Sequence, residues 1–390
     1  MQYRFVQFCV YLLLAVFGYS TAQENFRDDL LALEKERVLS AADDYLTADI
    51  QTITEVTSPR SAGGPHDFYS EGDYWWPDPE NHAGPYIRKD GLTNPDNFVE
   101  HRNRMRRLSI IVPTLVAAWT INHEDKYALK AIEHSNAWFV NEATRMNPDM
   151  LYSQAIFGRV TGRGIGIIDA IHLVEVAQAL MVLEENGLLK DDALEKTKTW
   201  FAQFNGWITT HPYGIEERDN GNNHSTCWAM QVAQYATFTG NDSLLITTEE
   251  FFENTLLLQQ MASDGSFPKE LARTKPYGYS LFNLDATYTL LHILSRRNPE
   301  VWQFQASDSL QVRKAVDFMM PYIANKSQWP YAPDVMYFDE WPMRQPALLF
   351  AYMAYRDVKY LEIWKALPAD SEEDEVIRNF FVRQPLLWVD

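Results

Sequence analysis

The chain is poor in cysteine, in basic residues and in long apolar runs, and each shortage excludes a class of protein. Only two cysteines, Cys9 and Cys227, occur in 390 residues, so the chain is not a small module held together by disulfides. Lys and Arg total 34 against 53 Asp and Glu, which gives a formal net charge of −19. Nucleic-acid binding requires a broad basic surface, and we therefore expect no nucleic-acid partner.

One apolar run, from Phe8 to Phe17, follows the single basic residue Arg4. The small residues after it fit a signal-peptidase site before Gln23, so we expect residues 1–22 to be a signal peptide and residues 23–390 to form a single domain. The alternative is a buried N-terminal helix. The run is too short for a stable anchor, which takes roughly 20 apolar residues. We expect a periplasmic or secreted monomer without a membrane anchor.

The sequence is instead rich in helical periodicity. Apolar residues recur at a period of 3.6 from about residue 28 onward, and the alternating runs typical of β-strands are nearly absent. Gly and Pro residues mark several of the expected helix ends. The predicted helices cover residues 30–42, 103–121, 125–142, 167–186, 191–208, 223–239, 242–261, 282–296, 307–324, 344–356 and 358–366.

These predicted helices are of two kinds. The helix at 223–239 is apolar or small on nearly every side, as expected for a helix buried between neighbours, whereas the helix at 191–208 confines its bulk to one stripe. Helices of the first kind recur at intervals of roughly 60 residues, which predicts an all-α fold, an (α/α) toroid or barrel of six to seven helical hairpins. A generic helical bundle is the alternative. In a toroid, loops at one end of the inner helices form the cleft.

One long loop places three aromatic residues, Tyr74, Trp75 and Trp76, in succession. Their flat apolar faces and polar edges suit stacking on a sugar ring. The same rings can instead plug the end of the barrel, and the sequence leaves both interpretations open.

Basic residues cluster near the expected cleft, although they are few in the whole chain. Arg102 and Arg106 share one face of a predicted helix, and the candidates for binding an anionic substrate also include Arg88 and Arg163. The glycines around Arg163 lack the ending of a phosphate-binding P-loop. These clusters predict a positive groove in a negative shell, because a binding site depends on local charge and not on the total.

Two polar clusters begin consecutive inner helices. The first contains Asn222, Asn223 and His224, whose donors join the free backbone N–H groups of a helix N-terminus in a site suited to a carboxylate. His224 can equally be a packing residue. The second cluster lies about 50 residues further on, and successive hairpins of a toroid bring such loops side by side. Its candidate residues are Arg273, Lys275, Tyr277 and Tyr279.

Asn, His, Arg and Tyr together suit β-elimination from a uronic acid. The C5 proton is weakly acidic, so donors such as Asn223 and Arg273 must neutralise the neighbouring carboxylate and stabilise the enolate-like intermediate. A base then removes the proton and an acid protonates the leaving O4, roles open to His and Tyr. Where the proton and O4 share a face of the sugar, as in mannuronate and glucuronate, one tyrosine can perform both steps.

Three motifs carry a family resemblance: Asn-Asn-His-Ser at 222–225, Glu-Leu-Ala-Arg at 270–273 with a tyrosine shortly after, and Tyr-Trp-Trp-Pro-Asp-Pro at 74–79. Over residues 65–360 the chain resembles the alginate-lyase domain of helical-toroid polysaccharide lyases. It is most similar to polysaccharide lyase family 38 and more distantly to family 5. The resemblance implies no metal or other cofactor, and β-1,4-linked mannuronan or glucuronan as the substrate.

The resemblance also implies roles for four residues. Asn223 and Arg273 neutralise the carboxylate, His224 acts as a base or as a further neutraliser, and Tyr279 acts as the acid and also as the base. Tyr279 is preferred to Tyr277 because its spacing from Arg273 fits the family 38 pattern.

Two other functions fit the same expected fold. The first is a glycoside hydrolase, which uses paired carboxylates. The second is a sugar-binding protein of the cell envelope that binds through the aromatic loop without catalysis. The candidate acids for hydrolysis are Asp73, Asp78, Glu216, Glu217, Asp219 and Asp285.

Overall fold

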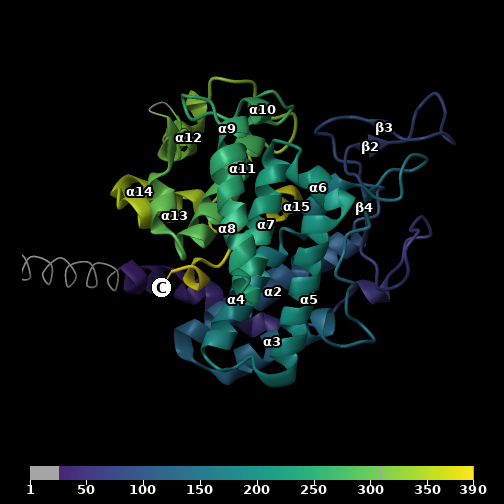
Figure 1. The fold of residues 1–390 in the computed structure, drawn as a ribbon, viewed down its shortest axis with the longest axis horizontal. Helices are drawn as coiled ribbons and strands as arrows, with labels where there is room; N and C mark the ends of the chain where they lie inside the picture. Colours follow the sequence, from purple (N-terminus) through teal and green to yellow (C-terminus); the bar gives the residue numbers. More distant parts are fainter. Residues whose placement is uncertain (1–25, 308–309, 390) are drawn as a thin grey trace, which may run out of the picture.

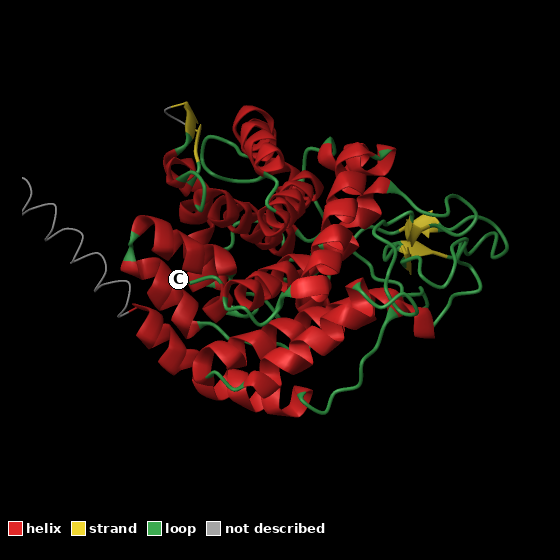
Figure 2. Cartoon of the chain, turned by 60° about the horizontal axis from the view of Figure 1, so that its bottom comes forward, coloured by secondary structure: helices red, strands yellow, loops and turns green. Residues whose placement is uncertain are grey.

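The computed structural model describes residues 26–307 and 310–389. The predicted signal peptide, with Cys9, lies outside the described residues. Helices make up most of the described chain. The strands between residues 69 and 155 and several long loops gather at one side of the helical body (Figures 1 and 2). Two short pairings lie there: β1 (Tyr69–Glu71) runs parallel to β4 (Tyr152–Ala155), and β2 (Trp75–Trp76) runs antiparallel to β3 (Ile87–Arg88).

Helices follow one another along the chain as hairpins, and the first members of successive hairpins pack side by side as an inner layer. This arrangement confirms the predicted α/α toroid, although the described residues form five helical hairpins and not the six to seven expected. The five hairpins of the described residues are α2 (Glu100–Asn122) with α3 (Asp125–Phe139), α4 (Leu173–Glu185) with α5 (Asp191–Thr210), α7 (Asn223–Thr239) with α8 (Asp242–Phe251), α11 (Pro276–Ser295) with α12 (Arg313–Ala324), and α13 (Pro346–Tyr355) with α14 (Val358–Ala366).

The contrast between inner and outer helices follows from their residues. Nearly every side chain of α7 is buried, whereas α5 buries a stripe that includes Trp200, Phe201 and Phe204. The ends of α7 are fixed by local chemistry. The Asn222 side chain caps its N-terminus by accepting a bond from the His224 N–H, and Gly240 closes the C-terminus at φ 71°, a left-handed conformation that glycine adopts without strain.

A helix over residues 26–45 joins the last hairpin to the first. Phe26 packs against Tyr352 of α13 with ring centroids 4.8 Å apart. Near the other end of this helix, the Tyr127 hydroxyl of α3 donates to Asp43 (2.7 Å). The N-terminal helix thereby contacts both ends of the row of hairpins.

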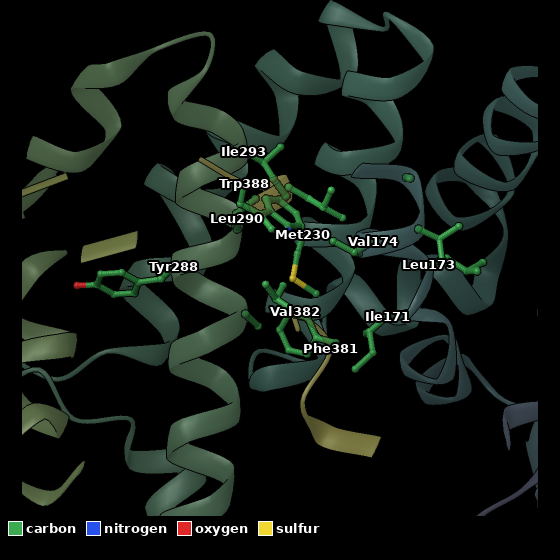
Figure 3. Close-up of a cluster of buried hydrophobic side chains, with 14 of the residues drawn as sticks. Ile171, Leu173, Val174, Met230, Tyr288, Leu290, Ile293, Phe381, Val382 and Trp388 are labelled. Atoms are coloured by element: carbon green, nitrogen blue, oxygen red, sulfur yellow. The ribbon is translucent and has the colours of Figure 1, made fainter. Parts of the chain in front are cut away.

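The C-terminal segment fills the centre of the ring. Glu175 of α4 accepts bonds from the backbone N–H groups of Arg383 and Gln384 and from the Trp388 indole. The Trp388 ring also packs against Phe350 of α13. Figure 3 shows the same segment lying among apolar side chains of the inner helices. The last residues are thus part of the core, and they follow α15 (Asp374–Asn379).

Several predicted helices differ in detail. The helix predicted at 282–296 begins earlier, because Pro276 occupies the first turn, where its missing N–H costs nothing. The segment 242–261 is interrupted by a π-helical turn, η3 (Phe252–Leu256), before α9 (Leu257–Gln260). The N-terminal part of 307–324 pairs as β5 (Gln305–Ser307) and β6 (Leu310–Gln311).

The first residues of the helix predicted at 167–186 belong instead to a 3-10 helix, η2 (Gly164–Ala170), and the α-helix α4 begins only at Leu173. No single described helix is long and apolar enough to cross a membrane, although η2 and α4 meet that test together as a bent pair. The remaining short helices are η1 (Ile53–Glu55), α6 (Pro212–Arg218), α10 (Pro268–Leu271), η4 (Pro299–Gln303), η5 (Lys326–Gln328) and η6 (Pro385–Leu387).

Candidate active site

A cavity of about 300 Å³ lies where α7 and α11 begin, beside the β2–β3 hairpin. It brings together most of the candidate residues from separate parts of the chain. The sequence-predicted residues that line it are Tyr74, Trp75, Arg88, Arg102, Arg163, Asn222, Asn223, His224, Arg273 and Tyr279.

The α7 wall of this cavity consists of Asn223, His224 and their partners. Glu270 of α10 accepts bonds from the backbone N–H of Asn223 (2.8 Å) and from its side-chain amide (2.7 Å). Burial raises the pKa of Glu270, and the bonds from Asn223 oppose that shift. The amide of Asn223 is therefore held in one orientation, with one N–H left for a ligand.

A second buried glutamate holds His224. The Nδ1 atom of His224 lies 2.9 Å from Oε1 of Glu217, which belongs to α6 and has no exposed surface. Burial raises the pKa of Glu217, while the His224 ring opposes that shift. Because Nδ1 faces the glutamate, Nε2 is the ring nitrogen left for a ligand.

The loop wall consists of Tyr74, Asp90, Arg273 and Tyr279. Nη2 of Arg273 donates to the Tyr279 hydroxyl (3.0 Å), and its guanidinium lies 4.1 Å from the centroid of that ring. The hydroxyls of Tyr279 and Tyr74 are 2.7 Å apart. Asp90, shortly after β3, accepts bonds from Nε and Nη2 of Arg273 (3.2 and 3.0 Å).

The surroundings of Tyr279 control its ionisation. Burial raises its pKa well above the ordinary value of tyrosine, Tyr74 adds to the shift, and the positive charge of Arg273 opposes it. At neutral pH Tyr279 is therefore mainly a phenol, a proton donor. The adjacent guanidinium stabilises the phenolate whenever the proton leaves.

Buried ion pairs form another part of the lining. Arg102 bonds Asp73 (2.7 Å) and lies 3.4 Å from Asp169, while Arg378 of α15 also bonds Asp73. Burial alone would raise the pKa of Asp73, but the two guanidinium groups lower it to about 2. Asp73 is therefore ionised and immobile at neutral pH.

The cavity carries more positive than negative charge. Five of its lining residues are arginines and two are aspartates, in a chain whose formal net charge is −19. The lining thus has the excess of basic residues that the sequence predicts for the groove. The arginines are Arg88, Arg102, Arg163, Arg273 and Arg378.

Four residues predicted to bind substrate do not line the cavity. Tyr277 is buried and donates to the Tyr322 carbonyl, because two positions along a helix lead to nearly opposite faces. Arg106 bonds Asp374, since one helical turn carries it past Arg102 and away from the cleft.

The other two of these residues lie close behind the loop wall or at its edge. The Trp76 indole donates to the Leu92 carbonyl. Lys275 is buried in an ion pair with Glu375, and its ammonium lies 5.3 Å from the Tyr74 ring centroid and 5.7 Å from that of Tyr279. Lys275 therefore supports the two tyrosines electrostatically without lining the cavity.

The acids considered for hydrolysis do not form a pair in the cavity. Hydrolysis needs two carboxyl groups on either side of the scissile bond, and of the six only Asp73 lines the cavity, where two arginines fix it. The carboxylates of the others have partners of their own: Asp78 accepts from the Glu80 N–H, Glu216 accepts from the Gly164 N–H, Glu217 bonds His224, Asp219 pairs with Arg218, and Asp285 accepts from the Ala347 N–H.

Several residues of the site were not predicted from the sequence. Glu270 stands in the Glu-Leu-Ala-Arg motif, so the motif itself could have indicated it. Arg378 and Asn379 had no local signal, because only the fold of the C-terminal segment brings α15 to the cavity. The other lining residues not predicted are Gln154, Ile165, Ile168, Asp169, Ile171, His172, Asn220 and Phe282. Within the described residues, no group of three or more His, Cys, Asp or Glu side chains could hold a metal ion.

The α/α toroid and its basic cleft agree with a polysaccharide lyase of the helical-toroid class, the class that the comparisons support. The sequence description of the alginate lyase family matches residues 52–329. The chain therefore belongs to the alginate lyase family. No protein with a curated description matches it significantly.

Solved structures agree with this assignment. An alginate lyase from Bacteroides ovatus is 30% identical, with a TM-score of 0.79 over 94% of this chain and 98% of that chain. Alginate lyase A1-III from Sphingomonas species A1 is 14% identical, with a TM-score of 0.57 over 90% and 94% of the two chains. A Tyr-to-Phe variant of A1-III complexed with a tetrasaccharide is 13% identical, with the same TM-score and coverage.

Proposed function

We propose that this protein is an exported lyase that cleaves a β-1,4-linked polyuronate, poly-mannuronate (alginate) or glucuronan, by β-elimination, and that it belongs to polysaccharide lyase family 38. The observation that carries the proposal is the contact of Arg273 with Tyr279 in a cavity that Asn223 and His224 also line. The names of the similar structures, two of them complexed with a tetrasaccharide, support a polysaccharide substrate. The N-terminal apolar run supports export.

The reacting uronate lies with its carboxylate between the α7 wall and Arg273. The free N–H of Asn223 and the guanidinium of Arg273 donate to the carboxylate, so that negative charge moving onto it from C5 is stabilised. When both of its ring nitrogens carry hydrogen, His224 donates Nε2–H to the same group, with Glu217 accepting from Nδ1–H. Fixed donors of this kind reduce the cost of forming the enolate-like intermediate because they need no reorganisation during the reaction.

Tyr279 performs both proton transfers. As a phenolate stabilised by Arg273, it takes the C5 proton. As electrons from that C–H bond form the C4=C5 double bond, the C4–O4 bond breaks, and Tyr279 returns the proton to O4. The products are a new chain end with the hydroxyl at O4 and an unsaturated uronate, and Tyr279 is again a phenolate.

A substrate panel tests the proposal. Purified protein is incubated with poly-mannuronate, poly-guluronate and glucuronan while the ultraviolet absorbance of the C4=C5 double bond and the reducing ends are followed together. We expect both signals to rise in parallel on poly-mannuronate or glucuronan. Reducing ends without absorbance would demonstrate hydrolysis, and binding without either signal would demonstrate a non-catalytic sugar-binding protein.

A further inference from the structure

Arg163 differs from the other arginines of the cavity in lacking a carboxylate partner. Within residues 26–307 and 310–389, it makes no ion pair. Its Nε donates to the backbone carbonyl of Gln154 (2.9 Å) and its Nη2 to the side-chain carbonyl of the same residue (3.0 Å). The other four are paired: Arg88 and Arg273 with Asp90, Arg102 with Asp73 and Asp169, and Arg378 with Asp73 and Glu375.

The guanidinium of Arg163 is partly shielded from solvent. Its guanidinium lies 5.8 Å from the centroid of the Trp75 ring. Burial lowers the pKa of Arg163 to about 10, although the charges of Asp169 and Asp73 oppose that shift. Arg163 is therefore still a cation at neutral pH. A desolvated guanidinium that bonds only neutral groups gains more from an arriving carboxylate than one that is already paired.

The backbone around Arg163 fixes its position. A Cβ atom added at Gly162 would lie 1.9 Å from the Leu151 carbonyl oxygen, and one at Gly164 would lie 2.7 Å from the Tyr213 carbonyl oxygen. Glycine on both sides thus permits close packing of the loop against neighbouring backbone. The Gln154 amide is also anchored, because its Nε2 donates to Asp169 (3.0 Å). The Gly-Arg-Gly sequence therefore presents one arginine on a rigid support.

We propose that Arg163 binds the carboxylate of a second uronate residue, next to the one that undergoes elimination. The proposal rests on the proposed function and deepens it. The Trp75 ring lies beside Arg163, and the hydroxyl of the preceding residue, Tyr74, contacts Tyr279. Two consecutive residues therefore connect the site at Arg163 with the site of the reacting uronate. The cleft then selects uninterrupted polyuronate, and a neutral sugar beside the reacting residue leaves the Arg163 charge uncompensated.

Binding without turnover tests this role. In a Tyr279→Phe background, dissociation constants are measured by calorimetry for mannuronate and glucuronate trisaccharides, each intact or with one carboxylate at a time reduced to an alcohol. We expect Arg163→Gln to weaken binding of the intact trisaccharide about tenfold or more. Reduction of one particular carboxylate of the trisaccharide should weaken its binding to the Tyr279→Phe protein by the same factor. The same reduction should weaken binding to the protein that also carries Arg163→Gln by less than twofold.

Arg159→Gln is the matched control. Arg159 also lies over the Trp75 ring (5.2 Å) but does not line the cavity, so its loss should change binding by less than twofold. Equal affinity for the intact trisaccharide with and without Arg163 would overturn the inference. So would a loss of affinity that, for each reduced carboxylate of the trisaccharide, is the same in the two proteins. If the wild type binds the trisaccharides but forms no double bond from any polyuronate, the proposed lyase activity fails while the Arg163 assignment stands.

Discussion

The two walls of the cavity are held in different ways. On the α7 wall, Asn223 and His224 bond Glu270 and Glu217, which are 1% and 0% exposed. On the loop wall, Arg273 bonds Asp90, and the side chains of that pair are 21% and 25% exposed. The α7 wall is thus anchored inside the core, and the loop wall is anchored at the rim.

The difference in burial indicates a different role for each wall. A carboxylate buried with its hydrogen-bond partners keeps them in one geometry, and breaking such a contact leaves an uncompensated polar group. A partly exposed ion pair contributes little and is screened by salt. We infer that the α7 wall is a rigid template for the substrate carboxylate, while the loop wall carries Tyr279, to which we assign the proton transfers.

The largest expected effect concerns the chemistry of the loop wall. Tyr279→Phe removes the proton-transferring hydroxyl and should lower kcat about a thousandfold, measured as the initial rate of double-bond formation on the preferred polyuronate. Tyr277→Phe is the control, because that buried hydroxyl donates to the Tyr322 carbonyl and does not line the cavity. It should leave kcat within about twofold. Full activity of Tyr279→Phe would remove Tyr279 from the mechanism.

The next effect tests the rigidity of the α7 wall. In Glu270→Gln, the new amide can place an NH₂ group against the Asn223 N–H groups, so that donor meets donor. We expect kcat to fall about thirtyfold, less than the loss of a whole oxyanion donor, with KM within about threefold. Glu249→Gln is a matched control, since Glu249 is also buried but bonds Arg297 and Asn298 away from the cavity. It should lower thermal stability and leave kcat unchanged.

The pH dependence of the wild type tests the proton-transfer role assigned to the loop wall. Burial raises the pKa of Tyr279, so its phenolate is scarce at neutral pH and becomes more abundant as the pH rises. If Tyr279 removes the C5 proton, kcat/KM should increase with pH above neutrality, by up to about tenfold per unit. Arg273 opposes the raised pKa, so Arg273→Gln should move this limb to higher pH. A profile flat from pH 7 to 9 would contradict a tyrosine base.

How much was predictable depends on whether the signal was local. The toroid followed from helix periodicity and from the contrast between all-round apolar helices such as 223–239 and one-sided helices such as 191–208. The cluster of Asn223 and His224 was visible because a helix N-terminus has a recognisable sequence. Its neighbour across the cavity, Arg273, was found because consecutive hairpins place their loops together.

The rest depended on tertiary contacts that no short segment encodes. Arg378 reaches the cavity only because the C-terminal chain enters the ring and bonds Glu175. Glu217 is seven residues before His224, and nothing in that spacing shows that α6 turns back toward the start of α7. Arg106 shares a helix face with Arg102, but the sequence does not show how far along the helix the cleft extends.

The smallest expected effect is the counterpart of Glu270→Gln on the loop wall. Asp90→Asn keeps an oxygen that can accept a bond from Arg273 but removes the charge that the guanidinium faces. Because this pair is partly exposed, we expect kcat/KM to fall only about threefold at low ionic strength, and the difference from the wild type to shrink as salt is raised. The measurement is the rate of double-bond formation at several salt concentrations. A loss as large as that of Glu270→Gln, insensitive to salt, would show that both walls are equally rigid, and the division of tasks between them would have to be abandoned.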